Sequence, residues 1–109
     1  ATRSFLRIAE NAGEHFPDVV RVIKPLLRPV QDGDMFTYRI YRNPKDNGRG
    51  ESHFAREYPR ETLELLDAIT GDDRIMLPYG FGDALNALVG FDPALQETPE
   101  YRRLGKLLD

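Results

Sequence analysis

Cysteine is absent from this chain of 109 residues, and only two histidines are present. The missing cysteine excludes disulfides, thiolate metal ligands and a cysteine nucleophile, and it suits a reducing, cytoplasmic compartment. No apolar run approaches the roughly 20 residues that a membrane-spanning helix needs, so no membrane association is expected. The N-terminus shows neither a signal peptide nor an initiator methionine, and we therefore expect a processed product or a fragment of a longer protein.

The composition is that of an ordinary globular protein. Hydrophobic residues make up 40% and charged residues 30%, and a chain of this length can bury one core, so residues 1–109 are expected to form a single domain. The net charge of -3 hides an asymmetry, because residues 1–60 hold eleven Lys or Arg against eight Asp or Glu, whereas residues 61–109 hold four against ten. A basic end would suit an acidic partner or phosphate, but solvated helix faces explain the same difference.

Apolar residues recur at helical spacing, which predicts an all-α fold of short helical hairpins, packed as a HEAT- or armadillo-like array or as an irregular bundle. One helix is expected between a Ser4 cap and a stop at Gly13. A second opens at Phe16 and Pro17, and kinks or stops at Pro25. The faces predicted to be apolar in these two helices are Phe5, Leu6, Ile8, Ala9 and Ala12, and Val19, Val20, Val22, Ile23, Leu26 and Leu27.

Residues 35–41 fit two structures. Phe36, Tyr38 and Ile40 alternate with polar residues as in an edge strand, yet residues 35–41 also fit a short helix. We favour the helix because no strand nearby offers a partner. The next segment, residues 43–50, holds a proline, two glycines and no apolar side chain, and it is predicted to be a flexible loop.

Three longer helices are predicted in the second half, after a short helix capped by Ser52. The first runs from Pro59 to a stop at Gly71, and the last follows a Thr98 cap. The middle helix is predicted from Tyr79 to Val89, closed by Gly90, or with a later start at Gly82 or Asp83, because Gly80 and Gly82 weaken its first turn. The predicted inward residues of the first two helices are Leu63, Leu65, Leu66 and Ile69, then Phe81, Ala84, Leu85, Leu88 and Val89. The last helix runs through Tyr101, Leu104, Leu107 and Leu108.

No catalytic constellation is recognisable, so we expect no enzyme activity, no cofactor and no metal. His53 and Glu57 share a helix face but lack a third ligand. The Gly80 to Gly82 segment lacks the remaining parts of a phosphate-binding loop. The only serines, Ser4 and Ser52, are expected at helix caps.

One segment combines basic and aromatic residues, as nucleic-acid binders do when they contact phosphates and stack bases. Its members are Arg39, Arg42, Lys45, Arg49, Tyr38 and Tyr41. They give an alternative hypothesis of nucleic-acid or partner binding through residues 39–49. The acidic balance of the whole chain favours instead core aromatics beside solvated arginines.

A weak internal sequence similarity supports a repeat architecture. Phe16 and Pro17 open one helix, and Tyr58 and Pro59 open another 42 residues later, within the roughly 40–47-residue period of HEAT and armadillo repeats.

The same aromatic-Pro pattern, residues 63–69, residues 92–95 and residues 101–104 together resemble C-terminal helical regions of large bacterial multidomain proteins. Some of those proteins carry ATPase or sirtuin-like effector domains and are linked to phage defence. The resemblance implies a non-catalytic helical scaffold or protein-interaction module, whose partner is the rest of the parent chain or another protein.

Overall fold

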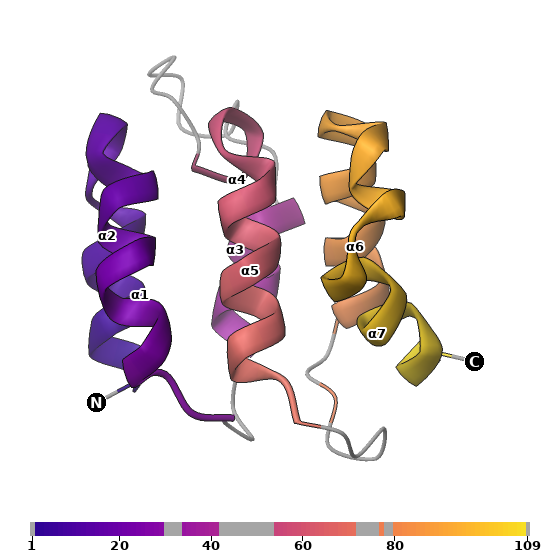
Figure 1. Ribbon diagram of the computed structural model, residues 1–109, viewed down its shortest axis with the longest axis horizontal. Coiled ribbons are helices and arrows are strands. Elements are labelled where there is room, and N and C mark those ends of the chain that lie inside the picture. Colours follow the sequence, from indigo (N-terminus) through magenta and orange to yellow (C-terminus); the bar gives the residue numbers. More distant parts are fainter. Residues whose placement is uncertain (1, 30–33, 42–53, 72–76, 78–79, 109) are drawn as a thin grey trace.

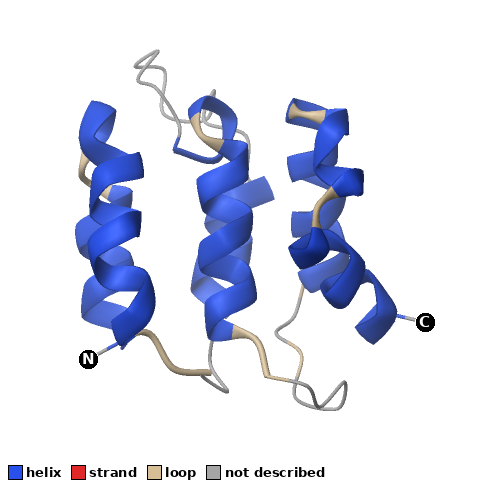
Figure 2. Ribbon diagram, viewed as in Figure 1, coloured by secondary structure: helices blue, strands red, loops and turns tan. Residues whose placement is uncertain are grey.

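The computed structural model describes residues 2–29, 34–41, 54–71, 77 and 80–108. These residues form helices and a few short turns, and no strand occurs among them, so the predicted all-α class is confirmed (Figure 2). Within the same residues, no helix is both long and apolar enough to cross a membrane. The predicted loop 43–50 and the predicted cap Ser52 lie outside the described residues.

The helices stand side by side in three groups (Figure 1). The first group forms one side of the molecule, the second lies in the middle and the third forms the other side. Helix α2 packs against α5, which packs against α7, and α3 packs against α6. The first group is α1 (Thr2–Glu10), η1 (Gly13–His15), α2 (Phe16–Ile23) and η2 (Lys24–Leu26); the second is α3 (Asp34–Tyr41), α4 (Phe54–Glu57) and α5 (Pro59–Ile69); the third is α6 (Phe81–Phe91), η5 (Pro93–Glu97) and α7 (Pro99–Leu108).

Proline and glycine set the boundaries of the first group, largely as predicted. Gly13 has a φ of 59°, the left-handed conformation expected after the first helix. Pro17 lies in the first turn of α2, and α2 ends before Pro25, which lies in the 3₁₀ turn η2. The predicted Ser4 cap is wrong, because α1 already begins at Thr2 and Ser4 therefore lies inside its first turn.

Residues 35–41 belong to helix α3, as favoured above. The helix places Phe36 and Ile40, four residues apart, on one buried face. A strand would have put Tyr38 on that same face, but the Tyr38 side chain is 39% exposed. Helix α3 packs against α6, and Phe36 stacks on Phe54 of α4 with ring centroids 5.8 Å apart, so tertiary packing decides the conformation of this segment.

Helix α5 is the centre of the core. Its four predicted inward residues, Leu63, Leu65, Leu66 and Ile69, are all buried. The hydroxyls of two buried threonines on this segment form hydrogen bonds to backbone carbonyls four residues earlier. Thr62 Oγ1 donates to Tyr58 O at 2.9 Å, and Thr70 Oγ1 donates to Leu66 O at 2.6 Å.

Helix α6 begins and ends differently from the prediction. It starts at Phe81, between the predicted starts at Tyr79 and at Gly82, because Gly80 takes the left-handed conformation at the N-cap with a φ of 80°. The predicted stop at Gly90 is wrong, and the helix continues to Phe91. Glycine is tolerated within a helix at about 1 kcal/mol, so the helix ends only where Asp92 becomes extended before Pro93.

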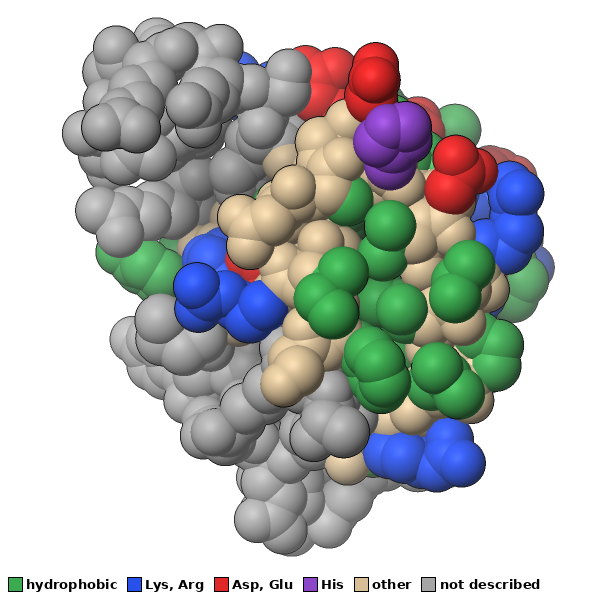
Figure 3. All heavy atoms as spheres, turned by 90° about the vertical axis from the view of Figure 1, so that its left-hand side faces the viewer, with side chains coloured by type: hydrophobic (Ala, Val, Ile, Leu, Met, Phe, Trp, Pro, Cys, Tyr) green, Lys and Arg blue, Asp and Glu red, His purple; other side chains and the backbone are tan. Residues whose placement is uncertain are grey.

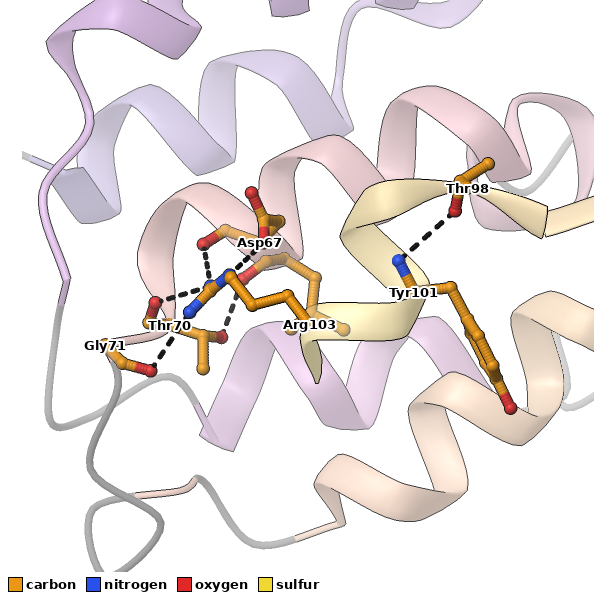
Figure 4. Close-up of polar contacts among 7 residues, drawn as sticks. Asp67, Thr70, Gly71, Thr98, Tyr101 and Arg103 are labelled. Carbon is orange, nitrogen blue, oxygen red and sulfur yellow. Dashed lines mark hydrogen bonds and ion pairs between the residues drawn. The ribbon is translucent and has the colours of Figure 1, made fainter. Parts of the chain in front are cut away.

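Figure 4 shows two contacts that hold helix α7 in place, one at its N-terminal cap and one made by an arginine in the middle of the helix. The predicted Thr98 cap is confirmed, because Thr98 Oγ1 accepts a hydrogen bond from Tyr101 N at 3.2 Å. Arg103 reaches across to the last turn of α5. Its Nε donates to Asp67 Oδ1 at 2.6 Å, and its Nη2 donates to the carbonyl oxygens of Asp67 and Thr70, each at 2.8 Å. The guanidinium thus satisfies carbonyls that the end of α5 leaves open.

Candidate functional site

The first helical group presents large apolar side chains to solvent. Val22 is 69% exposed, Ile8 is 55% exposed and Leu26 is 54% exposed. The sequence placed all three on apolar helix faces, and helical spacing alone does not tell whether such a face is covered within the chain. Leu108, on the last helix, is also largely exposed, at 49%.

The exposed residues belong to regular stripes. On α2 and η2, the buried residues Phe16, Val20, Ile23 and Leu27 follow the helical repeat. A second stripe, made of Val19, Val22 and Leu26, follows the same three- and four-residue spacing beside the buried one. Val19 is half-buried and packs against the core, whereas Val22 and Leu26 are exposed.

Helix α1 repeats this arrangement. Leu6 and Ala9 are buried, whereas Phe5 and Ile8, with Ala12 just beyond the helix, form a second stripe. Ile8 is exposed, Phe5 and Ala12 are half-buried, and Phe5 packs against the core. We call the two outer stripes together the outer apolar face. Its members are Phe5, Ile8, Ala12, Val19, Val22 and Leu26.

Figure 3 looks at the side of the molecule formed by α1 and α2, and it shows hydrophobic side chains gathered at the centre of this side. Acidic side chains and a histidine lie along the upper edge, and basic side chains lie at the lower edge and at the flanks. A contiguous apolar patch with a charged rim is typical of a protein interaction surface rather than of scattered surface leucines and valines.

The described part of the basic and aromatic segment has an internal role. Arg39 forms an ion pair with Glu10 across α3 and α1, with its Nη2 donating to Glu10 Oε2 at 2.8 Å. Tyr38 and Tyr41 meet edge to face, with ring centroids 5.7 Å apart. Tyr41 is half-buried and Tyr38 is 39% exposed. The other three members, Arg42, Lys45 and Arg49, lie outside the described residues, and nucleic-acid binding stays a prediction.

Glu10 is a buried acid that the sequence did not single out. Its side chain is only 7% exposed. Burial raises the pKa of the Glu10 carboxyl above its usual 4.5, while the hydrogen bond and charge of Arg39, and the charge of Arg7, act in the opposite direction. Glu10 and Arg39 stand 29 residues apart on different helices, so no local pattern could reveal the pair.

A shallow groove of about 450 Å³ lies between α2 and α5. Basic and acidic side chains line it together, and Lys24 Nζ lies 3.7 Å from Glu64 Oε1. Such mixed charge offers neither an activated nucleophile nor a field of one sign. The lining residues are Pro17, Val20, Arg21, Lys24, Pro25, Arg60, Glu61 and Glu64.

The histidine, acid and glycine candidates occupy structural positions where they are described. His15 is exposed beside Glu14, with 3.8 Å between His15 Nε2 and Glu14 Oε1. Glu57 is exposed on α4, and His53 lies outside the described residues. Gly80 forms the left-handed turn before α6. Across the ranges given above for the structure, no three His, Asp or Glu side chains gather as a metal-binding group.

Comparison with known proteins finds no match among protein-family models, curated proteins or solved structures. The candidate function therefore rests on the outer apolar face and its surroundings.

Proposed function

We propose that this chain is a non-catalytic helical packing module, and that its outer apolar face binds an amphipathic helical surface of a protein partner. The observation that carries the proposal is the second apolar stripe on α1 and on α2, with Val22, Ile8 and Leu26 each more than half exposed. Exposing such stripes to water is unfavourable by roughly 25 cal/mol for each Å² of apolar surface, so a partner that covers them gains that free energy.

The packing inside the molecule indicates what kind of partner fits. The inner stripe of α2 is covered by helix α5, and α1 meets α3 through Glu10 and Arg39. The outer stripes have the same spacing as the inner stripe of α2, so they match the ridge of another amphipathic helix or helical hairpin.

The two aromatic-Pro helix starts support a repeat scaffold of the HEAT or armadillo type. Phe16 at the start of α2 and Tyr58 before α5 lie side by side, with ring centroids 5.6 Å apart and an interplanar angle of 15°. Neighbouring repeats in such scaffolds place equivalent residues side by side. Terminal repeats of these arrays need a polar outer face, and the apolar outer face of α1 and α2 suits an internal repeat or a docking site. The resemblance to helical regions of larger bacterial proteins fits the same role.

A designed two-helix peptide tests the proposal. The peptide carries a leucine stripe and a fluorescein label, and it is made in acidic, basic and neutral versions. We expect at least one version to bind the wild-type protein saturably in fluorescence anisotropy. Val22→Asp, which places a charge in the centre of the face, should weaken binding at least tenfold.

Leu108→Asp is the matched control, because Leu108 is also a large exposed apolar residue but lies at the other end of the chain, on α7. It should bind like the wild type. Thermal melts of both variants check that folding is unchanged. Failure of all three peptides to bind, or equal binding to all three proteins, would contradict the proposal.

A further inference from the structure

The outer apolar face carries charges of opposite sign at its two ends. Glu14 and Asp18 lie where α1 turns into α2, and their side chains are 86% and 72% exposed. Arg28 lies at the opposite end of this face, beyond η2, and it is exposed. In Figure 3, red side chains lie along the upper edge of this face, and blue side chains lie at its lower edge and at its flanks.

We infer that the outer apolar face binds a second copy of this chain, in a two-fold dimer in which α2 lies antiparallel to its counterpart. The inference rests on the proposed function, because it names the partner of the same face. A two-fold interface joins a patch to itself, so the patch must be self-complementary in shape and in charge.

Charge selects one of two arrangements. A two-fold axis parallel to the helices would bring the acidic end of one copy against the acidic end of the other, which is unfavourable. An axis in the interface but perpendicular to the helices reverses the second copy. It places Glu14 and Asp18 of each copy near Arg28 of the other, and both ends of the interface then pair opposite charges.

The apolar stripe fits the same arrangement. Val22 lies at the centre of the stripe formed by Val19, Val22 and Leu26. In the antiparallel dimer, Val22 lies near the axis and faces its own counterpart, and Val19 lies opposite Leu26. Asp18 forms an ion pair with Arg21 within each copy at 3.8 Å, but both side chains are largely exposed, and exposed pairs are weak enough for Asp18 to face Arg28 as well.

The expected dimer is weak. A patch of this kind on one side of a small protein covers a few hundred Å², and interfaces at the lower end of the size range belong to transient complexes. Sedimentation equilibrium of the full chain from about 10 μM to about 1 mM therefore suits the association. We expect the apparent mass to rise from monomer to dimer, Val22→Asp to stay monomeric over this range, and Leu108→Asp to dimerise like the wild type.

Charge reversal tests the orientation. Asp18→Arg and Arg28→Glu should each weaken the homodimer about tenfold, because each puts like charges at both ends of the interface. An equimolar mixture of the two variants should recover wild-type association, since both ends of the mixed dimer then pair opposite charges. A parallel dimer places residue 18 against residue 18 and residue 28 against residue 28, so neither variant would weaken its homodimer relative to the wild type, and this lack of weakening would identify the parallel arrangement.

Three outcomes would overturn the inference: a monomer at every concentration, a dimer that Val22→Asp leaves intact, or no recovery in the mixture. If the chain stays monomeric but the two-helix peptide still binds, only the identity of the partner is wrong. If neither association occurs, the proposed function is wrong as well.

Discussion

Replacing Arg103 tests whether one side chain fastens α7 to α5. Arg103→Met keeps most of the aliphatic stem but removes the guanidinium that contacts the Asp67 carboxylate and the last carbonyls of α5 (Figure 4). Hydrogen bonds to charged groups contribute about 1.5–3 kcal/mol. The side chains of Arg103 and Asp67 are 34% and 25% exposed, so water replaces part of the loss. We therefore expect a destabilisation of about 2 kcal/mol rather than the sum of the individual bonds.

Arg103→Lys should fall between Arg103→Met and the wild type. An ammonium keeps the positive charge near the C-terminus of α5, but it lacks the planar fork that reaches the Asp67 carboxylate and two carbonyls at once. The matched control is Arg102→Met, because Arg102 is the exposed neighbour on the same helix. Its effect should stay within about 0.5 kcal/mol.

Urea titration measures the three free energies of unfolding, and thermal melting gives an independent measure. A loss of about 2 kcal/mol corresponds to a fall in Tm of roughly 8–16 °C for a domain of this size. Equal stability of Arg103→Met and Arg102→Met would refute the reasoning. Wild-type stability of Arg103→Lys would show that charge alone, without the fork geometry, explains the contact.

Three further substitutions test the core, a turn and a buried acid. Leu66→Ala should destabilise by about 2–5 kcal/mol in a denaturant titration, because Leu66 is fully buried on α5, and a loss below about 1 kcal/mol would contradict its central position. Gly80→Ala should destabilise the protein by more than about 1 kcal/mol, since the φ of Gly80 is 80° and the added Cβ would lie 2.8 Å from Tyr41 Cε1. In the control Gly90→Ala, within helix α6, the added Cβ meets nothing within 4 Å, and this variant should stabilise the protein by up to about 1 kcal/mol. Thermal melts that fail to separate these two variants would count against the turn geometry. Because burial raises the pKa of Glu10 above 4.5, its contribution to stability is present below pH 4.5 and is lost as pH rises through the raised pKa. The unfolding free energy of the wild type minus that of Glu10→Gln should therefore fall as the pH rises above about 4.5, and a constant difference would exclude the raised pKa.

The sequence by itself determined the helical class and several of the helix boundaries. Pro17 and Pro59 mark helix starts and Gly13 marks a left-handed turn, because these residues restrict or free the backbone locally. The cap at Thr98 was also predictable, since a cap depends on residues within one turn. The four inward residues of α5 followed from helical periodicity, because that helix has a single apolar side.

Only the tertiary structure decided which apolar residues are covered and which distant residues meet. Val22 and Val20 have the same hydrophobic character, but Val20 contacts the core and Val22 does not, because α2 packs on one side only. Periodicity records the spacing of apolar residues along a helix and not the number of its neighbours. The contact of Arg103 with Asp67 joins residues 36 apart, on helices whose approach depends on the whole core. The candidate interaction face therefore became visible only when the packed helices showed which of two similar stripes remains exposed.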